Sequence, residues 1–297
     1  MMIIVNFFLF FTNIPLWLKH ALPYHGITII DLGGPLFLFV LGIFYALSFE
    51  KRMARDGARK TVQHFVIRYL TLWLFGFVGI LVTTYQLTFG WNVLMAIGLS
   101  GLYALPFMFL KPIWRLIVGI ALLVFYQLVI LQFFSNVVLS YDMGGFLGGI
   151  SWAALVLMAS FWWHHVKKDN HNQLTSLGLG FGIVSLAVGF GLAQFFPASK
   201  PLVSSSYIPI AYGAAVLGLL VFHWLGEIKK VPWKIFEIMG KNALLLYMVS
   251  SVINMIVQSW VGAALAGPLV VFDGLLIYGV CLAVAYWLDY RKLYIKL

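Results

Sequence analysis

Runs of about 20 apolar residues recur from one end of this 297-residue chain to the other, and they constrain its fold more than any other feature. Each run is long enough to cross the hydrocarbon core of a bilayer as a helix, where backbone polar groups must bond within their own segment. Only 9% of the residues are charged, whereas soluble domains carry roughly 25%. The sequence therefore predicts an all-α integral membrane protein and argues against a soluble globular fold.

The lengths of the apolar runs predict about ten transmembrane helices, joined by short loops into a single domain over residues 1–297. The first run follows Met1 without a basic segment, so we expect a retained span rather than a cleaved signal peptide. The predicted spans are residues 1–18, 29–49, 62–84, 92–110, 113–134, 147–165, 173–195, 207–225, 242–260 and 266–288.

The lysines and arginines set the predicted orientation. With an even number of spans and both termini in the cytoplasm, 17 of the 19 basic residues fall on the cytoplasmic side. The two exceptions, Lys19 and Lys200, fall on the opposite face. The net charge of +10 is divided among short clusters between apolar runs, which indicates contact with anionic lipid and no nucleic-acid partner.

One candidate site stands out at the outer face. His20 closes the first predicted span and Asp31 opens the second, so the short connection makes these two residues neighbours. Imidazole groups titrate near neutrality, and a nearby carboxylate fixes their tautomer, so His20, Asp31 and Lys19 form a candidate acid–base centre. The alternative interpretation is a solvated loop histidine beside an aspartate that caps the start of a helix.

A second polar cluster enters the eighth predicted span, where Lys200 is followed by three serines and Tyr207. These groups are either a polar lip for a hydroxyl-rich substrate or caps for the free amides of the helix start. Asn6, inside the first span, similarly either serves the site or satisfies a neighbouring helix. No phosphate-loop, zinc-helix or dinucleotide motif is present, and we predict no metal site.

Four segments of the chain carry a likeness to a known family. Residues 2–7 read Met-Ile-Ile-Val-Asn-Phe, residues 19–39 contain Lys-His-Ala, Gly-Ile-Thr-Ile-Ile-Asp-Leu and Pro-Leu-Phe-Leu-Phe in that order, residues 200–207 read Lys-Pro-Leu-Val-Ser-Ser-Ser-Tyr, and residues 239–244 read Met-Gly-Lys-Asn-Ala-Leu. Together they resemble the heparan-alpha-glucosaminide N-acetyltransferase family of transmembrane acyltransferases. The second segment is similar to that family's His-Ala-x-Trp-x-Gly-Leu-Thr-x-Ala-Asp-Leu-x-x-Pro signature, and the third to its Lys-x-Leu-Trp-Thr-x-Ser-Tyr motif. The family's opening Asp-x-x-Arg-Gly stretch is missing, so we expect a truncated or divergent member.

The resemblance implies an enzyme of a bacterial inner (plasma) membrane that moves an acetyl group from cytoplasmic acetyl-CoA to an amino sugar or other glycan acceptor on the far side. His20 would be the catalytic base or a transient acyl carrier, supported by Asn6 and Asp31. A supporting role predicts that Asp31→Asn impairs transfer less than His20→Ala does. The residues expected to bind CoA are Arg68, Lys241 and Asn242, and those expected to bind the acceptor are Lys19, Lys200, Ser204, Ser206 and Tyr207.

The charge distribution agrees with CoA binding at the cytoplasmic face and acceptor binding at the opposite face. CoA is a polyanion, and the cytoplasmic face supplies a dense basic rim for its phosphates. The alternatives are a transporter or flippase for a sugar-like or lipid-linked solute, which needs no histidine chemistry, and a purely structural subunit. The resemblance is also compatible with a homodimer, and it leaves open N- versus O-acylation and direct transfer versus an acyl-histidine intermediate.

Overall fold

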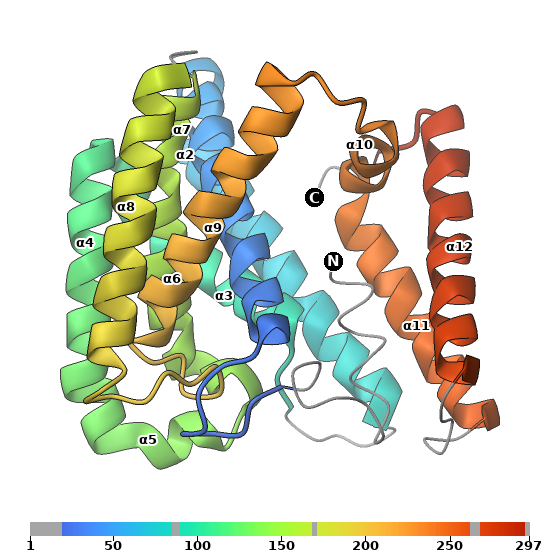
Figure 1. The fold of residues 1–297 in the computed structure, drawn as a ribbon, viewed down its shortest axis with the longest axis horizontal. Helices are drawn as coiled ribbons and strands as arrows, with labels where there is room; N and C mark the ends of the chain where they lie inside the picture. Colours follow the sequence, from blue (N-terminus) through green and yellow to red (C-terminus); the bar gives the residue numbers. More distant parts are fainter. Residues whose placement is uncertain (1–19, 85–89, 168–170, 262–267, 295–297) are drawn as a thin grey trace. The chain divides into compact units, whose positions relative to one another are not determined.

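The computed structural model describes residues 20–84, 90–167, 171–261 and 268–294, which form helices and no strand (Figure 1). This confirms the predicted all-α class. In chain order the elements are the short helix η2 (Ile29–Leu32), α2 (Gly33–Thr84), α3 (Val93–Ala104), η3 (Leu105–Phe109), α4 (Pro112–Phe125), η4 (Tyr126–Ile130), α5 (Leu131–Leu139), η5 (Asp142–Gly144), α6 (Gly145–Ser160), α7 (Trp162–Lys167), α8 (His171–Leu192), α9 (Tyr207–His223), η6 (Trp224–Ile228), α10 (Lys234–Lys241), α11 (Ala243–Val261) and α12 (Pro268–Tyr290).

Within the described residues, five helices are long and apolar enough to cross a membrane, and the number is six if the bent pair formed by α10 and α11 is counted as one span. Two further predicted spans coincide with shorter apolar helices, Val93–Phe109 and Gly274–Tyr290. The predicted span 1–18 lies outside the described residues. The number of ten spans therefore stays a prediction.

The outward surface of α4 is apolar, as expected of a helix in lipid. Ile113, Ile117, Ile120 and Val124 are each between 45% and 52% exposed and follow one another at helical spacing. The opposite side, which includes the buried Leu123, packs inward. A stripe of this kind would expose a large apolar patch to water, whereas lipid tails solvate it without penalty.

The described chain divides into two compact units by its internal contacts. The first unit contains His20, Thr28–Gly33 and the described part of residues 222–294, and the second contains Ala21–Ile27 and Gly34–Val221.

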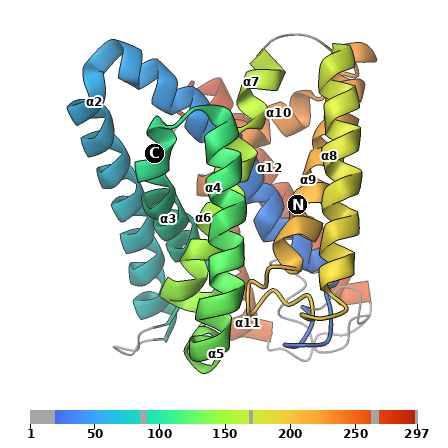
Figure 2. The ribbon, with the colours of Figure 1, turned by 90° about the vertical axis from the view of Figure 1, so that its left-hand side faces the viewer.

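α2 is a helical hairpin within the second unit. The sequence predicts a loop between spans 29–49 and 62–84, but the helix continues through this stretch and is interrupted at Gly57, whose φ of 75° is left-handed (Figure 2). The predicted loop is helical because its residues are mostly good helix formers, and Gly57 is the one position suited to the reversal. The two arms pack through aromatic rings, with 4.7 Å between the ring centroids of Tyr45 and Phe65.

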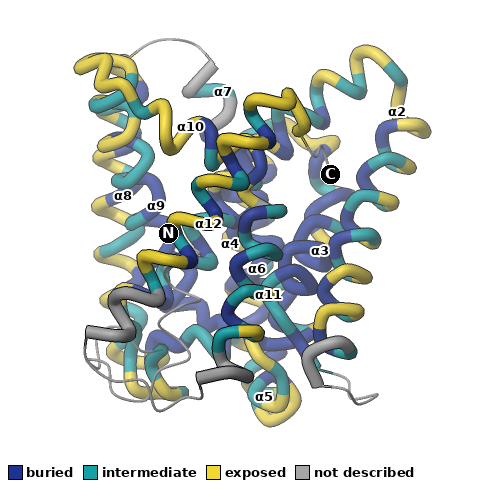
Figure 3. The backbone as a smooth tube through the Cα atoms, turned by 90° about the vertical axis from the view of Figure 1, so that its right-hand side faces the viewer, coloured by how far each residue is buried: buried dark blue, intermediate teal, exposed yellow. Residues whose placement is uncertain are grey.

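α6 is the buried centre of the second unit, with most of its residues hidden from solvent (Figure 3). Glycines allow its neighbours to approach closely. A Cβ atom added at Gly42 of α2 would lie 2.6 Å from the carbonyl oxygen of Val156, and one added at Gly119 of α4 would lie 2.9 Å from that of Ala154. The same device joins α8 to α9, as is common where helices associate in membranes.

In the first unit, α11 and α12 lie side by side (Figure 1). Their shared core, with one residue from α10, consists of Ile238, Leu246, Ile277, Cys281 and Ala285.

Candidate functional site

The predicted pair of His20 and Asp31 is in direct contact in the first unit. His20 Nδ1 lies 2.5 Å from Asp31 Oδ1. The Asp31 side chain is fully buried, and that of His20 is 28% exposed. The predicted proximity of these two residues is thus confirmed. The His20 side chain remains partly exposed, so other molecules can reach it.

The local chain explains why Asp31 points at His20. Thr28 precedes the short helix η2, and both its backbone N–H and its hydroxyl donate to Asp31 Oδ2, at 2.9 and 3.1 Å. The capping interpretation placed Asp31 at the start of the helix, but Thr28 holds that position and Asp31 is the third residue of η2. A carboxylate at this position reaches back to the free amide before the helix. One oxygen therefore completes the helix start while the other meets the imidazole.

This arrangement has a defined chemical consequence. An ionised carboxylate can only accept hydrogen bonds, so Nδ1 of His20 is the donor and carries a proton. In the neutral ring Nε2 then holds the lone pair, which is the state of a general base. The two other residues predicted to belong to this centre, Asn6 and Lys19, lie outside the described residues.

The predicted acceptor residues Ser204, Ser206 and Tyr207 lie in the second unit and are buried. The Ser204 hydroxyl oxygen accepts from the N–H of Ser199 at 3.0 Å and from that of Tyr207 at 3.3 Å. The Ser206 hydroxyl donates to the carbonyl of Phe196 at 2.6 Å. This geometry agrees with the capping interpretation for Ser204, while contact with an acceptor stays a prediction.

Lys200, at the start of the same loop, is partly exposed, and its carbonyl accepts from the Val203 N–H at 3.1 Å. Of the predicted acceptor residues described in the structure, it is the one that a solute can approach without movement of the loop.

Gln127 and Tyr126 hold this loop, and the sequence reasoning missed both. They belong to η4, a π-helical turn that continues α4. Gln127 Oε1 accepts from the Ser205 hydroxyl at 2.7 Å and from the Ser205 N–H at 3.2 Å. The Tyr126 hydroxyl donates to the carbonyl of Leu202 at 2.9 Å. Gln127 is one of two glutamines inside the apolar run 113–134. Polar amides at such positions were the available signal, because in a membrane they find partners on other segments.

Arg68, the predicted phosphate contact, lies on the second arm of α2 in the second unit. Its Nε atom is buried without a hydrogen-bond partner among the described residues. Its guanidinium carbon lies 5.7 Å from the centre of the Tyr69 ring. A buried donor that lacks a partner is costly, so this residue is suited to an anion.

Lys241 and Asn242, also predicted to bind CoA, lie in the first unit and both have partners there. Lys241 Nζ is 3.0 Å from Asp289 and 3.2 Å from Glu237. Buried Asn242 donates to the carbonyl of Leu293 at 3.1 Å. The Tyr294 hydroxyl donates to Asp289 at 2.9 Å, and this bond raises the pKa of the hydroxyl.

A further ion cluster in the second unit was also missed. The sequence counted Arg115 among the basic residues on the cytoplasmic side. Its side chain is buried and donates to the carbonyls of Met108 and Leu110 at 2.8 and 2.9 Å. Its Nη1 is 3.9 Å from Glu50, which is 3.0 Å from His164 Nε2. The two hydrogen bonds from Arg115 to carbonyls at the end of η3 indicate a structural role, because they hold this end of η3 against α4. No group of three or more possible metal ligands occurs among the described residues.

Comparison with known proteins adds no relative, since no protein-family model matches the chain and no curated protein gives a significant match.

Proposed function

We propose that this protein is a membrane-embedded acyltransferase that moves an acetyl group from cytoplasmic acetyl-CoA to an amino sugar or other glycan acceptor on the extracytoplasmic side. It would lie in a bacterial inner membrane with about ten spans and both termini in the cytoplasm. One observation supports this function most directly, namely the contact of His20 Nδ1 with the buried carboxylate of Asp31. An ionisable group buried in a membrane protein has a high free-energy cost, so such groups are candidates for function by default.

In the proposed reaction the acceptor amine attacks the carbonyl carbon of the thioester. His20 Nε2 takes the amine proton as the new carbon–nitrogen bond forms. The carbon–sulfur bond breaks and CoA leaves as a thiolate, which takes the proton from the His20 imidazolium and so restores the neutral ring. A transient acetyl group on His20 would divide the same chemistry into two transfers. Asp31 stabilises the imidazolium and holds the ring in one tautomer in either route.

The two substrates differ in charge, and the residues proposed for them differ accordingly. Arg68 is proposed to contact a CoA phosphate, since a charged phosphate oxygen would accept a hydrogen bond from its buried Nε. Lys200, with Lys19, is proposed to face the acceptor. Lys241 is a weaker candidate for phosphate binding than Arg68, because two carboxylates already compensate its charge.

One observation favours the transporter alternative. The helix segments Lys234–Lys241 and Leu245–Val257 meet at an angle of 84°, as in a broken span. Discontinuous helices of this kind form the midplane binding sites of many secondary transporters. A transporter would not need acetyl-CoA, so binding of this compound separates the two functions.

The function is tested with the purified full chain, acetyl-CoA and glucosamine as the acceptor, by following release of the CoA thiol. His20→Ala is expected to lower turnover by about 10²–10⁴-fold while acetyl-CoA still binds, because general-base catalysis contributes that much. His25→Ala is the matched control, since His25 lies in the same connection and is exposed. Near-normal turnover of His20→Ala would refute the proposed centre, and a wild-type protein that does not bind acetyl-CoA would refute the acyltransferase.

Whether His20 carries the acyl group is tested by incubating the protein with labelled acetyl-CoA and no acceptor. Acid-labile label on His20 is the expected sign of the carrier route, and its absence favours direct transfer.

A further inference from the structure

The reversal of α2 at Gly57 carries a dense group of positive charges. Residues 51–60 contain five basic residues and one acidic residue, which leaves a net charge of +4 on ten positions (five minus one). All five basic residues are exposed or partly exposed. We call this group the basic bend, and it consists of Lys51, Arg52, Arg55, Arg59 and Lys60.

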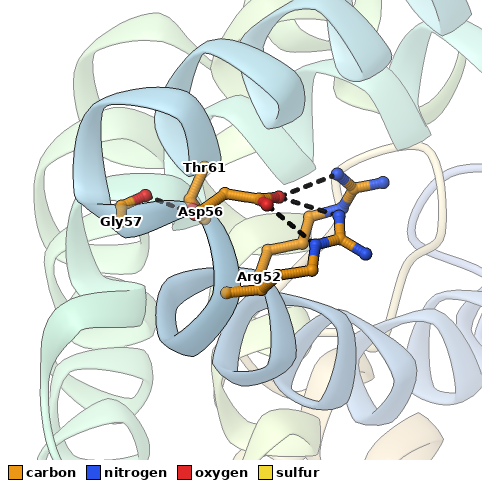
Figure 4. Close-up of polar contacts among 5 residues, drawn as sticks. Arg52, Asp56, Gly57 and Thr61 are labelled. Atoms are coloured by element: carbon orange, nitrogen blue, oxygen red, sulfur yellow. Dashed lines mark hydrogen bonds and ion pairs between the residues drawn. The ribbon is translucent and has the colours of Figure 1, made fainter.

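Asp56 orients two of these side chains instead of cancelling the group. Arg55 donates to both carboxylate oxygens of Asp56, at 2.7 and 2.8 Å, and Arg52 Nη1 lies 3.6 Å from the same carboxylate (Figure 4). The two guanidinium groups therefore lie together on one side of the bend. Arg55 uses the Nε–Nη2 edge of its guanidinium for Asp56, and the remaining N–H groups of the oriented guanidinium groups can donate to phosphate oxygens.

The backbone of the bend is fixed by its own residues. The hydroxyl of buried Thr61 donates to the carbonyl of Gly57 at 2.7 Å. Glu50, the nearest other acid in the sequence, is directed to His164 and Arg115. Arg52 and Arg55 are therefore held in a defined geometry, and among the described residues no second acid forms an ion pair with the basic bend.

Apolar side chains lie where the bend would enter a bilayer. On the two arms, Phe44 is 59% exposed and Ile67 is 56% exposed. Each lies seven residues from the nearest end of the basic bend, which is about 10 Å along a helix. In this arrangement the cations would meet the phosphate headgroup of a phospholipid, and the exposed apolar side chains would meet its acyl chains.

We propose that the basic bend is a binding surface for anionic phospholipids, which takes their phosphate headgroups between its guanidinium and ammonium groups. The surface is open, with Lys51, Arg59 and Lys60 exposed, whereas a soluble phosphate compound is normally held in an enclosing pocket. A lipid layer offers many phosphates at once to such a surface. This role goes beyond the proposed function, because no step of acetyl transfer requires it.

The test measures lipid binding by the purified full chain. The protein is titrated with phosphatidylglycerol and with phosphatidylcholine in detergent, and bound lipids are counted by native mass spectrometry. The double variant Arg59→Gln with Lys60→Gln removes two charges that make no hydrogen bond or ion pair within the described residues. The matched control is Arg291→Gln with Lys292→Gln, an equal change of charge at exposed positions beyond α12.

Each basic residue near an anionic surface contributes about fivefold in affinity, so the variant at the bend should bind phosphatidylglycerol roughly thirtyfold more weakly. Binding of phosphatidylcholine, and both affinities of the control variant, should change little. Equal loss of phosphatidylglycerol in the two variants would overturn the proposal, because it would reflect net charge alone. An unchanged lipid affinity with weakened binding of free CoA would also overturn it, by assigning the bend to the soluble compound.

Discussion

Replacing Asp31 with asparagine is the sharpest test of the candidate site, because size and shape are kept while the pattern of acceptors changes. The carboxylate accepts from the Thr28 N–H and hydroxyl through Oδ2 and from His20 Nδ1 through Oδ1. A backbone N–H is a fixed donor, so the amide oxygen of the variant must take the place of Oδ2. The amide nitrogen, itself a donor, then faces Nδ1.

The expected result is a change of tautomer in His20. Nδ1 has to accept from the new amide, so the ring proton moves to Nε2, which can no longer take a proton from an acceptor amine. The general-base contribution of about 10²–10⁴-fold is then lost, and the turnover of Asp31→Asn should come within about tenfold of that of His20→Ala. The sequence alone predicts a milder effect, since a purely orienting residue would be replaced by one of equal shape. The bond from Thr28 reverses that expectation.

The assay is thiol release from acetyl-CoA, combined with thermal unfolding to establish that each variant folds. Thr28→Val is the control, because it removes one hydroxyl donor and keeps the N–H bond to Asp31, so turnover should fall by less than about tenfold. Combining Asp31→Asn with His20→Ala should cost little beyond either change alone, as for groups that act as a unit. Retention of a third or more of wild-type turnover by Asp31→Asn would show that this reasoning is wrong.

Three further predictions address the rest of the molecule. A cysteine placed in residues 85–91 should react with an impermeant thiol reagent from outside, and labelling only after lysis would overturn the topology. Arg68→Ala should weaken CoA binding about tenfold or more in a titration, and unchanged affinity would remove it from the site. Gly42→Ala should lower the free energy of unfolding by about 1–3 kcal/mol, because its Cβ would lie 2.6 Å from a carbonyl oxygen, whereas Gly180→Ala, with nothing within 4 Å, should be neutral or stabilising.

Most of the long helices within the described residues coincide with predicted apolar runs, because lipid admits few ways to satisfy a backbone. The apolar run 207–225, for example, corresponds to α9 and the turn η6 that follows it. The stretch between the second and third spans was not predictable in the same way. Its charges indicated a loop, yet charged side chains on a helix end can reach water while the backbone remains helical. The charges therefore did not mark a break in the helix, and Gly57 alone marks the turn.

The candidate site was predictable where it is local. His20 and Asp31 are 11 positions apart, so a short connection is enough to bring them together. Ser205 and Gln127 are 78 positions apart, and their bond depends on how η4 packs against the loop before α9. A single sequence can mark Gln127 as a polar residue in an apolar run, but it does not indicate which segment the side chain bonds. The burial of Ser204 also depends on tertiary packing. A serine before a helix gives the same sequence pattern whether the residue is buried or exposed.

The two interpretations of Asp31 are compatible once its oxygens are considered separately. A cap requires one acceptor for the Thr28 N–H, and Oδ2 provides it. A neutral serine or asparagine would supply that acceptor without placing an ionised group in a site hidden from solvent, where a charge without compensation costs several kcal/mol. The carboxylate brings a second oxygen, and that oxygen contacts His20. The helix start thus explains where Asp31 lies, whereas the choice of an acid at that position is explained by the histidine beside it.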